Sequence, residues 1–246
     1  MRMGKTVIYP VGKTEAVRYA AGFLEAAGIT MVDHPTPDAT HLLLDVPVRF
    51  GGDVEKNLEM LPEDITVIGG NLDHPALAGY GTVDLLRDPE YLAQNAAITA
   101  HCAVKVALPY LGITLPNCGV LVIGWGRIGK VLGQLLQALG ADVTIAARKK
   151  TDRAMIRALG YKAADTYDLG AVLPGQRLVY NTVPEPILSA DAPFRKGCVK
   201  IELASRPGIG GTDVIQARGL PGVHAPETSG KLIADTIIRL LEEGAK

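Results

Sequence analysis

The sequence predicts an α/β protein made of parallel sheets covered by helices and arranged as two lobes. Short runs rich in Val and Ile alternate with helical patterns through most of the chain, which is typical of parallel strands joined by crossover helices. A mostly helical stretch divides these segments into two groups. A glycine-rich turn follows the first apolar run of the second group. At 246 residues the chain can bury a substantial core.

The first lobe is expected over residues 1–95. Its apolar runs "KTVIYP", "THLLLD" and "ITVIGG" predict strands, and "VEKNLEML" predicts a short helix. A second helix is predicted from Thr14 to Ala27, with Gly28 as its stop. The triplet that starts at Gly12 resembles the end of a phosphate-binding P-loop, but the glycine expected before it, with four residues between, is missing. The sequence therefore favours an ordinary turn there.

The second lobe is expected over residues 96–229. A mostly helical stretch, residues 88–110, connects the two lobes and ends near Pro109. Six strands are predicted at residues 119–123, 142–147, 161–164, 177–182, 198–203 and 222–225. A last helix, Gly230 to Glu243, carries its apolar residues largely on one face. We expect residues 230–246 to dock near the first lobe.

The strongest motif lies at the start of the second lobe. It consists of Gly124, Trp125, Gly126, Arg127, Ile128 and Gly129. The motif follows the apolar run "VLVI" and opens a helical pattern that stops at Gly140. This order of strand, glycines, helix and second strand predicts a doubly wound Rossmann domain that binds a dinucleotide. The alternative is a glycine-rich turn that binds nothing.

The end of the second predicted strand indicates which dinucleotide is bound. NAD sites carry an acidic residue there to bind the ribose hydroxyls, whereas this chain has Ala147, Arg148 and Lys149. Asp142 begins the strand and lies at its wrong end. Because Arg148 can bind a 2′-phosphate, we expect NADP. A solvated basic loop is the alternative, and Thr151 either contacts the phosphate or caps the next helix.

Polar residues follow three of the predicted strands. In an open α/β sheet, ligands lie at the carboxyl ends of the strands, so we expect these residues to converge on one cleft. Each group also has a structural alternative: a strand end for Asn181 and Thr182, a turn beside Arg206, and a structural role for His224. They are Asn181, Thr182 and Pro184, then Ser205 and Arg206, and then His224, Glu227, Thr228 and Ser229.

Composition limits the class of protein. Lys and Arg total 25 against 26 Asp and Glu, so no overall charge favours nucleic acid or an anionic membrane. The cysteines Cys102, Cys118 and Cys198 are far apart and show no metal-binding spacing. The amino-terminal run "MRMGKTVIYPVGK" lacks a signal-peptide core, and no stretch reaches a membrane span. We expect a cytoplasmic protein without a metal.

Several of these segments together resemble the A subunit of dipicolinate synthase. The resemblance rests on the run from "NAAITAHCAVKV" through "VLVIGWGRIGK" to "TIAARKK", and on "YNTVP", "ELASRPG" and "GLPGVHAPETSG". It covers roughly residues 80 to 240, whereas the first lobe is a poorer match. It implies a flavodoxin-like first lobe, an NADP-binding Rossmann lobe and oxidation of dihydrodipicolinate to dipicolinate in sporulating bacteria. It also implies that the protein works with a flavoprotein-like B subunit. Separately, we expect the chain to form a homo-oligomer.

The resemblance also implies roles for individual residues. Cofactor contacts are expected from the glycine motif and from Ala147, Arg148, Lys149, Thr151, Asn181, Thr182, Val183, Pro184 and Ala204. The two substrate carboxylates would be held by Arg206, Ser205 and Thr228, and the proton taken by His224 or His101. The chain departs from the family at His101 and Cys102, where an acidic residue and glycine are expected, and at Glu227, where lysine is expected.

Three hypotheses follow from this pattern. The first is an oxidoreductase of the dipicolinate synthase A type that uses NADP and a small dicarboxylate. The second is an NADP-dependent enzyme acting on another small carboxylic acid. The third is a protein that binds NADP for sensing or assembly without turnover, which the departures at His101 and Glu227 favour because they alter only the substrate side.

Overall fold

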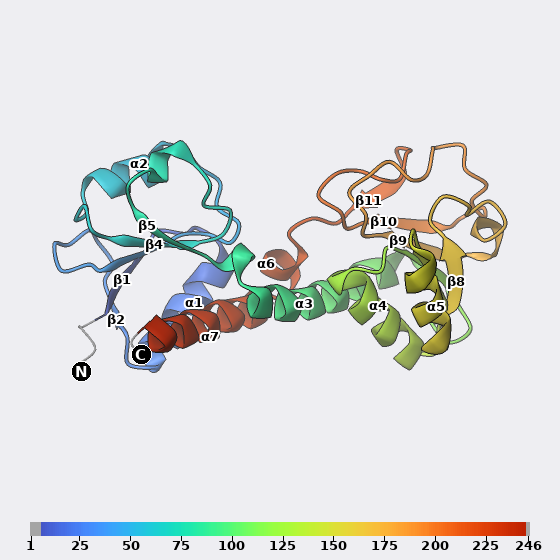
Figure 1. Ribbon diagram of the computed structural model, residues 1–246, viewed down its shortest axis with the longest axis horizontal. Helices are drawn as coiled ribbons and strands as arrows, with labels where there is room; N and C mark the ends of the chain where they lie inside the picture. The colour runs from blue at the N-terminus through green and yellow to red at the C-terminus, as the bar shows by residue number, and fades with distance from the viewer. Residues whose placement is uncertain (1–5, 245–246) are drawn as a thin grey trace. The chain divides into compact units, whose positions relative to one another are not determined.

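The computed structural model describes residues 6–244. Residues 1–5 and 245–246 lie outside this description, and with them Lys5 of the first predicted strand and the start of the amino-terminal run. The chain forms two compact units. Unit 1 contains the residues up to Asn95 and those from Pro221 onward, and unit 2 contains Ala96–Leu220. Each unit has its own sheet with helices packed on it (Figure 1).

The sheet of unit 1 has five parallel strands. They are β1 (Val7–Pro10), β2 (Thr30–Met31), β3 (His41–Leu43), β4 (Thr66–Gly69) and β5 (Gly81–Asp84). Their order in the sheet is β2-β1-β3-β4-β5, and every neighbouring pair is parallel. This is the flavodoxin-like order. The predicted strands correspond to β1, β3 and β4, whereas β2 and β5 were not predicted.

Three α-helices accompany this sheet. They are α1 (Glu15–Ala26), α2 (Gly52–Glu59) and α7 (Pro226–Gly244), with short 3-10 turns η1 (Pro75–Leu77) and η2 (Leu85–Arg87). Thr14 caps α1 by accepting a hydrogen bond from the N–H of Val17, and such a cap satisfies a backbone donor that the helix leaves unpaired. The sequence thus predicts α1 and α2 well.

The two long helices of unit 1 cross at a glycine. A Cβ atom placed on Gly230 of α7 would lie 2.5 Å from Cβ of Tyr19 and 2.6 Å from the carbonyl oxygen of Ala16, both on α1. Further along α7, Arg239 Nη2 lies 2.8 Å from the carboxylate of Asp88. The apolar face of α7 therefore packs against α1 with little space between the backbones.

A buried apolar cluster joins one face of this sheet to α2. It includes Leu42 from β3, Leu44 directly after β3, Val67 from β4, and Val54 and Leu58 from α2. Leu42, Leu44 and Val67 are at most 1% exposed. Alternate residues of a strand point to the same face of a sheet, which is why Leu42 and Leu44 both enter this cluster.

Unit 2 has six parallel strands and the Rossmann strand order. Its strands are β6 (Gly119–Ile123), β7 (Asp142–Ala147), β8 (Lys162–Asp165), β9 (Leu178–Asn181), β10 (Val199–Glu202) and β11 (Val214–Gln216). The order is β11-β10-β9-β6-β7-β8, which reverses direction between β6 and β9. The helices are α3 (Pro89–Ala107, continuing from unit 1), α4 (Arg127–Ala138) and α5 (Lys150–Ala158), with 3-10 turns η3 (Leu108–Tyr110) and η4 (Leu173–Gly175).

The predicted sixth strand, residues 222–225, is wrong. Leu220–His224 is a short helix, α6, and the sixth strand is β11 instead. A run of four residues cannot be assigned to strand or helix by its pattern, and Pro221 near the start favours a helix. Within residues 6–244, the segments between β9 and β10 and between β10 and β11 contain no helix, although the sequence suggested helices between most strands.

Other expectations concern cysteines, metals and membranes. Cys102, Cys118 and Cys198 are all unpaired thiols in buried positions, and burial raises the pKa of Cys198 to about 11. In the described part of the chain, no group of three or more His, Cys, Asp or Glu side chains could hold a metal ion. None of the described helices is both long and apolar enough to span a bilayer.

Candidate dinucleotide-binding site

The glycine motif forms a tight turn between β6 and α4. Gly124 has a φ of +110°, and a Cβ there would lie 2.2 Å from Oγ1 of Thr182. A Cβ on Gly129 would lie 2.1 Å from the carbonyl oxygen of Gly124. These two glycines therefore let α4 approach the strand end and let the loop after β9 approach the turn.

Gly126 has a different reason to be glycine. It is the N-cap of α4, its φ of −82° suits any residue, and it supplies no side-chain cap. A Cβ there would meet no protein atom within 4 Å. The first turn of α4 carries no acidic residue. Backbone N–H groups and the positive end of a helix dipole bind phosphate, so a dinucleotide pyrophosphate fits the open space beside Gly126.

The turn from β7 to α5 places positive charge at a helix N-terminus. Lys149 is the N-cap of α5 and offers no side-chain acceptor, and Lys150 is its first helical residue. Arg148 and Lys149 are exposed. Cations at this end of a helix are unfavourable by about 0.3–1 kcal/mol each. The alternative in which Thr151 caps the helix is wrong, because Thr151 lies within α5.

Arg153, which the sequence did not single out, holds this turn in place. Its Nη1 donates to the carbonyl oxygens of Ala147 and Arg148, both at 2.8 Å. The same atom lies 2.8 Å from a carboxylate oxygen of Asp165, at the end of β8. The backbone of Arg148 is thereby restrained while its side chain faces solvent. Asp142, at the opposite end of β7, pairs with Lys162.

The tip of β9 contacts the glycine turn, but its asparagine points inward. Asn181 is fully buried, and its amide donates to Val183 O at 2.9 Å and to Glu202 Oε1 at 2.7 Å. Oγ1 of Thr182 donates to the carbonyl oxygen of Ile123 at 2.8 Å. The Asn181 side chain thus orders the loop, and Val183 is the residue of this tip that lines the cleft.

Glu202 at the end of β10 is a buried carboxylate that accepts four hydrogen bonds. Besides Asn181, the backbone N–H groups of Ala204, Gly208 and Ile209 donate to it at 3.0, 2.7 and 3.1 Å. It is completely buried. The carboxylate joins the loops after β9 and β10 at the carboxyl edge of the sheet.

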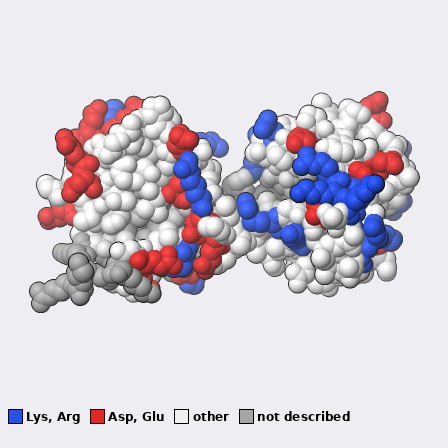
Figure 2. Space-filling model, viewed as in Figure 1, with Lys and Arg blue, Asp and Glu red and all other residues white. Residues whose placement is uncertain are grey.

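These turns enclose an open cleft, and Lys and Arg side chains gather on unit 2 where α5 begins (Figure 2). The cleft is lined by Gly124, Trp125, Ala147, Arg148, Lys149, Asp152, Thr166, Tyr167, Val183 and Glu185. Asp152, Thr166, Tyr167 and Glu185 were not predicted. Of the other predicted contacts, Arg127, Thr151 and Pro184 are exposed, Ile128 is half-buried and Ala204 is buried.

The predicted catalytic residues are divided between the two units. His101 on α3 and Ser205 and Arg206 after β10 are exposed residues of unit 2. His224 on α6 and Thr228 in α7 belong to unit 1, as does Glu227. Because residues 222–225 are not a strand of the Rossmann sheet, the argument that three strand tips converge does not hold. Only the tips of β9 and β10 meet, through Glu202.

Comparison with known proteins gives both sequence and fold relatives. The A subunit of dipicolinate synthase from Bacillus subtilis (strain 168) is 30% identical over 173 residues, 65% of this chain and 58% of that protein. The chain thus spans less than two thirds of that relative's length. No family model matches.

Solved structures extend the likeness in fold to nearly the whole chain. The A subunit of dipicolinate synthase from Bacillus halodurans has a TM-score of 0.79 at 21% identity, covering 97% of this chain and 99% of that one. A transhydrogenase from Sinorhizobium meliloti has a TM-score of 0.72 at 15% identity, covering 96% and 93%. Several dehydrogenases share the fold less closely. The chain is thus similar to dipicolinate synthase A subunits, in sequence over 173 residues and in fold over nearly its whole length.

Proposed function

We propose that the protein is an NADP-dependent oxidoreductase that converts dihydrodipicolinate to dipicolinate. The observation that carries the proposal is the cationic start of α5 at the end of β7, where Arg148, Lys149 and Lys150 meet the positive end of a helix dipole. Asp152 in the first turn of α5 opposes part of this positive charge, and a bound phosphate dianion would neutralise the rest. A 2′-phosphate on the adenosine ribose supplies that charge at this position of a Rossmann site.

The remaining cofactor contacts follow from the two turns. The pyrophosphate would bind at Gly126 and the first N–H groups of α4, where space is open and no carboxylate opposes it. Arg148 would bind the 2′-phosphate and stack beside the adenine, while Arg153 positions the backbone of that turn. Bound NADP⁺ supplies a hydride acceptor.

On the substrate side, oxidation of a dihydropyridine removes one hydride and one proton and leaves an aromatic ring. On unit 2, Arg206 and Ser205 are proposed to hold one carboxylate of the substrate, and His101 to take the proton. Aromatisation supplies much of the driving force, so orientation over the nicotinamide would be the main task of the protein. The Bacillus subtilis relative is one subunit of a synthase, and we propose that this chain likewise works with a second one.

Cofactor selectivity tests the proposal directly. Arg148→Ala should weaken NADP⁺ binding by roughly ten- to a hundredfold, the size expected for a charge-assisted hydrogen bond, and change NAD⁺ binding little. Titration calorimetry of both nucleotides measures this. Arg157→Ala is the matched control, because Arg157 is an exposed arginine in the last turn of the same helix. Equal loss of both nucleotides in Arg148→Ala would contradict the assignment.

Turnover tests the reaction itself. Dihydrodipicolinate generated in place should give dipicolinate absorption and NADPH together, whether or not the second subunit is present. NADPH formation with other small acids alone would favour the second hypothesis. Tight NADP⁺ binding without any turnover would favour a binding protein.

A further inference from the structure

The second topological switch point of the molecule lies in unit 1. Strand β1 has β2 on one side and β3 on the other, so the chain leaves β1 and β3 in opposite directions. In open α/β sheets such a point leaves a crevice at the carboxyl ends of the strands, and ligands bind there. In unit 1 these ends continue into Val11 and Leu44.

A cavity lies at this point. Its volume is about 430 Å³, within the range of small-molecule pockets. It is lined by Val11, Gly12, Lys13, Leu44, Asp45, Val48, Arg49, Gly51 and Val54. Every lining residue comes from the segment after β1, the segment after β3 or the start of α2. The cavity is thus built within unit 1.

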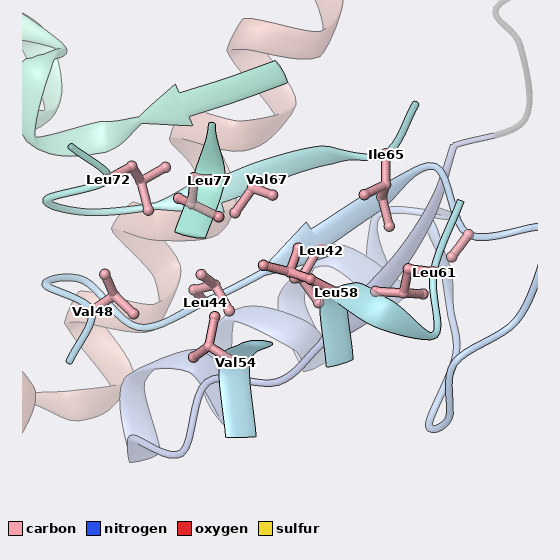
Figure 3. Packing of buried hydrophobic residues seen from close by; sticks show 11 residues of the cluster. Leu42, Leu44, Val48, Val54, Leu58, Leu61, Ile65, Val67, Leu72 and Leu77 are labelled. Atoms are coloured by element: carbon pink, nitrogen blue, oxygen red, sulfur yellow. The ribbon is translucent and has the colours of Figure 1, made fainter. Parts of the chain in front are cut away.

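The cavity has an apolar wall and a cationic rim. Leu44, Val48 and Val54 are buried and belong to the core cluster of unit 1. Figure 3 shows them grouped at one end of that cluster. Lys13 and Arg49 are the cations of the lining, and both are exposed. This combination suits a ligand with an apolar body and an anionic group.

Asp45, the carboxylate of the lining, is engaged by the protein. Its oxygens accept from the N–H of Lys13 at 3.1 Å, the N–H of Thr14 at 3.0 Å and the hydroxyl of Thr14 at 2.7 Å. A Cβ on Gly12 would lie 2.8 Å from Asp45 Oδ1. A side-chain carboxylate therefore occupies the N-terminus of α1, which excludes a P-loop phosphate, and fixes the loop that carries Lys13.

We propose that this cavity binds a small carboxylic acid with a flat apolar body, whose carboxylate meets Lys13 and Arg49. Arg49 can bind a carboxylate through its planar fork, and Lys13 adds a point charge. The apolar ring would cover Leu44, Val48 and Val54. The inference deepens the proposed function, on which the choice of a pyridine dicarboxylate as probe rests, and assigns to unit 1 a part in holding the acid.

Binding of dipicolinate to the full chain without nucleotide tests this inference. The parent should bind it measurably in titration calorimetry, and Lys13→Ala and Arg49→Ala should each weaken binding by roughly tenfold or more. Arg49→Lys should fall between parent and Arg49→Ala, because it keeps the charge and loses the fork. Arg18→Ala is the control, since Arg18 is an exposed arginine of α1 paired with Glu15, and should bind like the parent.

NADP⁺ affinity provides the second readout. It should be unchanged in Lys13→Ala and Arg49→Ala, which shows that these variants fold. Absence of dipicolinate binding to the parent, or unchanged affinity in both variants, overturns the inference. Dipicolinate binding that depends on Lys13 and Arg49 in a chain without NADP⁺-dependent turnover would support the inference and contradict the proposed function. Turnover whose KM for the acid is unaffected in both variants would support the proposed function and contradict the inference.

Discussion

Glu202 shows how a single buried side chain shapes the nucleotide edge of unit 2. Four N–H donors converge on its carboxylate from the loops after β9 and β10. A buried charge is tolerated only when it is fully hydrogen-bonded, and these four donors, one from the Asn181 side chain and three from the backbone after β10, meet that condition. Glu202 is a positioning residue because it acts through Asn181 and the backbone.

Glu202→Gln should lower the free energy of unfolding by about 2–4 kcal/mol. The amide replaces one acceptor oxygen with a donor that faces N–H groups, so buried donors lose their partners. Urea denaturation monitored by circular dichroism measures the loss.

Glu185→Gln is the matched control for this change. Glu185 is exposed and follows the neighbouring strand, so its substitution should change stability by less than about 0.5 kcal/mol. If the two variants unfold at the same urea concentration, Glu202 does not hold the loops together.

Residues whose structural position depends on neighbours along the chain could be recognised from the sequence. The glycines of the β6–α4 turn and the basic run at Arg148 belong to one strand–turn–helix pattern, so spacing reveals them. Arg153 and Glu202 were missed because they act on residues elsewhere in the sequence, such as Asp165 and Asn181. No local pattern identifies a residue by partners that only folding brings near.

The elements of unit 1 illustrate how packing overrides local preference. Gly22 on α1 and Gly230 on α7 are both helical glycines, and glycine costs about 1 kcal/mol relative to alanine in a helix. A Cβ on Gly22 would meet nothing within 4 Å, whereas one on Gly230 would overlap the backbone of α1. The same residue type is thus a local weakness at one position and a packing requirement at the other.

Gly22→Ala and Gly230→Ala should therefore change stability in opposite directions. Gly22→Ala should stabilise the protein by about 0.5–1 kcal/mol. Gly230→Ala should destabilise it by about 1–3 kcal/mol, because the helices must move apart. Thermal and urea unfolding of the pair provide the measurement, each variant serving as the control for the other. Stabilisation by both would mean that α1 and α7 do not pack closely at Gly230.

At the scale of elements, long periodic segments were predictable and short ones were not. Helices α1, α4 and α5 and strands β6 and β7 carry clear patterns and punctuation. The segment 222–225 was assigned as a strand and is helix α6, and β2, with two residues, left no signal. A short segment takes its structure from the surface on which it packs, and the sequence pattern does not contain that surface.

At the scale of the whole molecule, residues 6–244 form two open parallel sheets, each with its own switch point. In unit 2 the switch lies between β6 and β9, beside the glycine turn, and in unit 1 it lies between β1 and β3, beside Lys13 and Arg49. The cofactor site and the proposed acid-binding cavity thus lie in separate loops on separate sheets. Hydrogen exchange distinguishes such sites, because a ligand protects the segments that it orders.

NADP⁺ at a hundred times its Kd should slow exchange in the segments 124–130 and 148–153 by up to roughly a hundredfold, where opening requires release of the ligand. Segment 44–51 of unit 1 should be unaffected by NADP⁺ and protected by dipicolinate. The strand segment 120–123 serves as the internal control, since it is buried and hydrogen-bonded without ligand. Protection of 44–51 by NADP⁺ alone would contradict the separate assignment.

Local pattern sufficed for the α/β class, the glycine turn and the basic end of β7, because each depends on residue types at short spacing. It did not reveal that His224 and Thr228 belong to unit 1 while Arg206 belongs to unit 2. Nor did it reveal that Asp45 closes the N-terminus of α1, or that a cavity lies beside it. These features depend on which strand lies beside which, and strand order in a parallel sheet is decided by packing between segments distant in sequence.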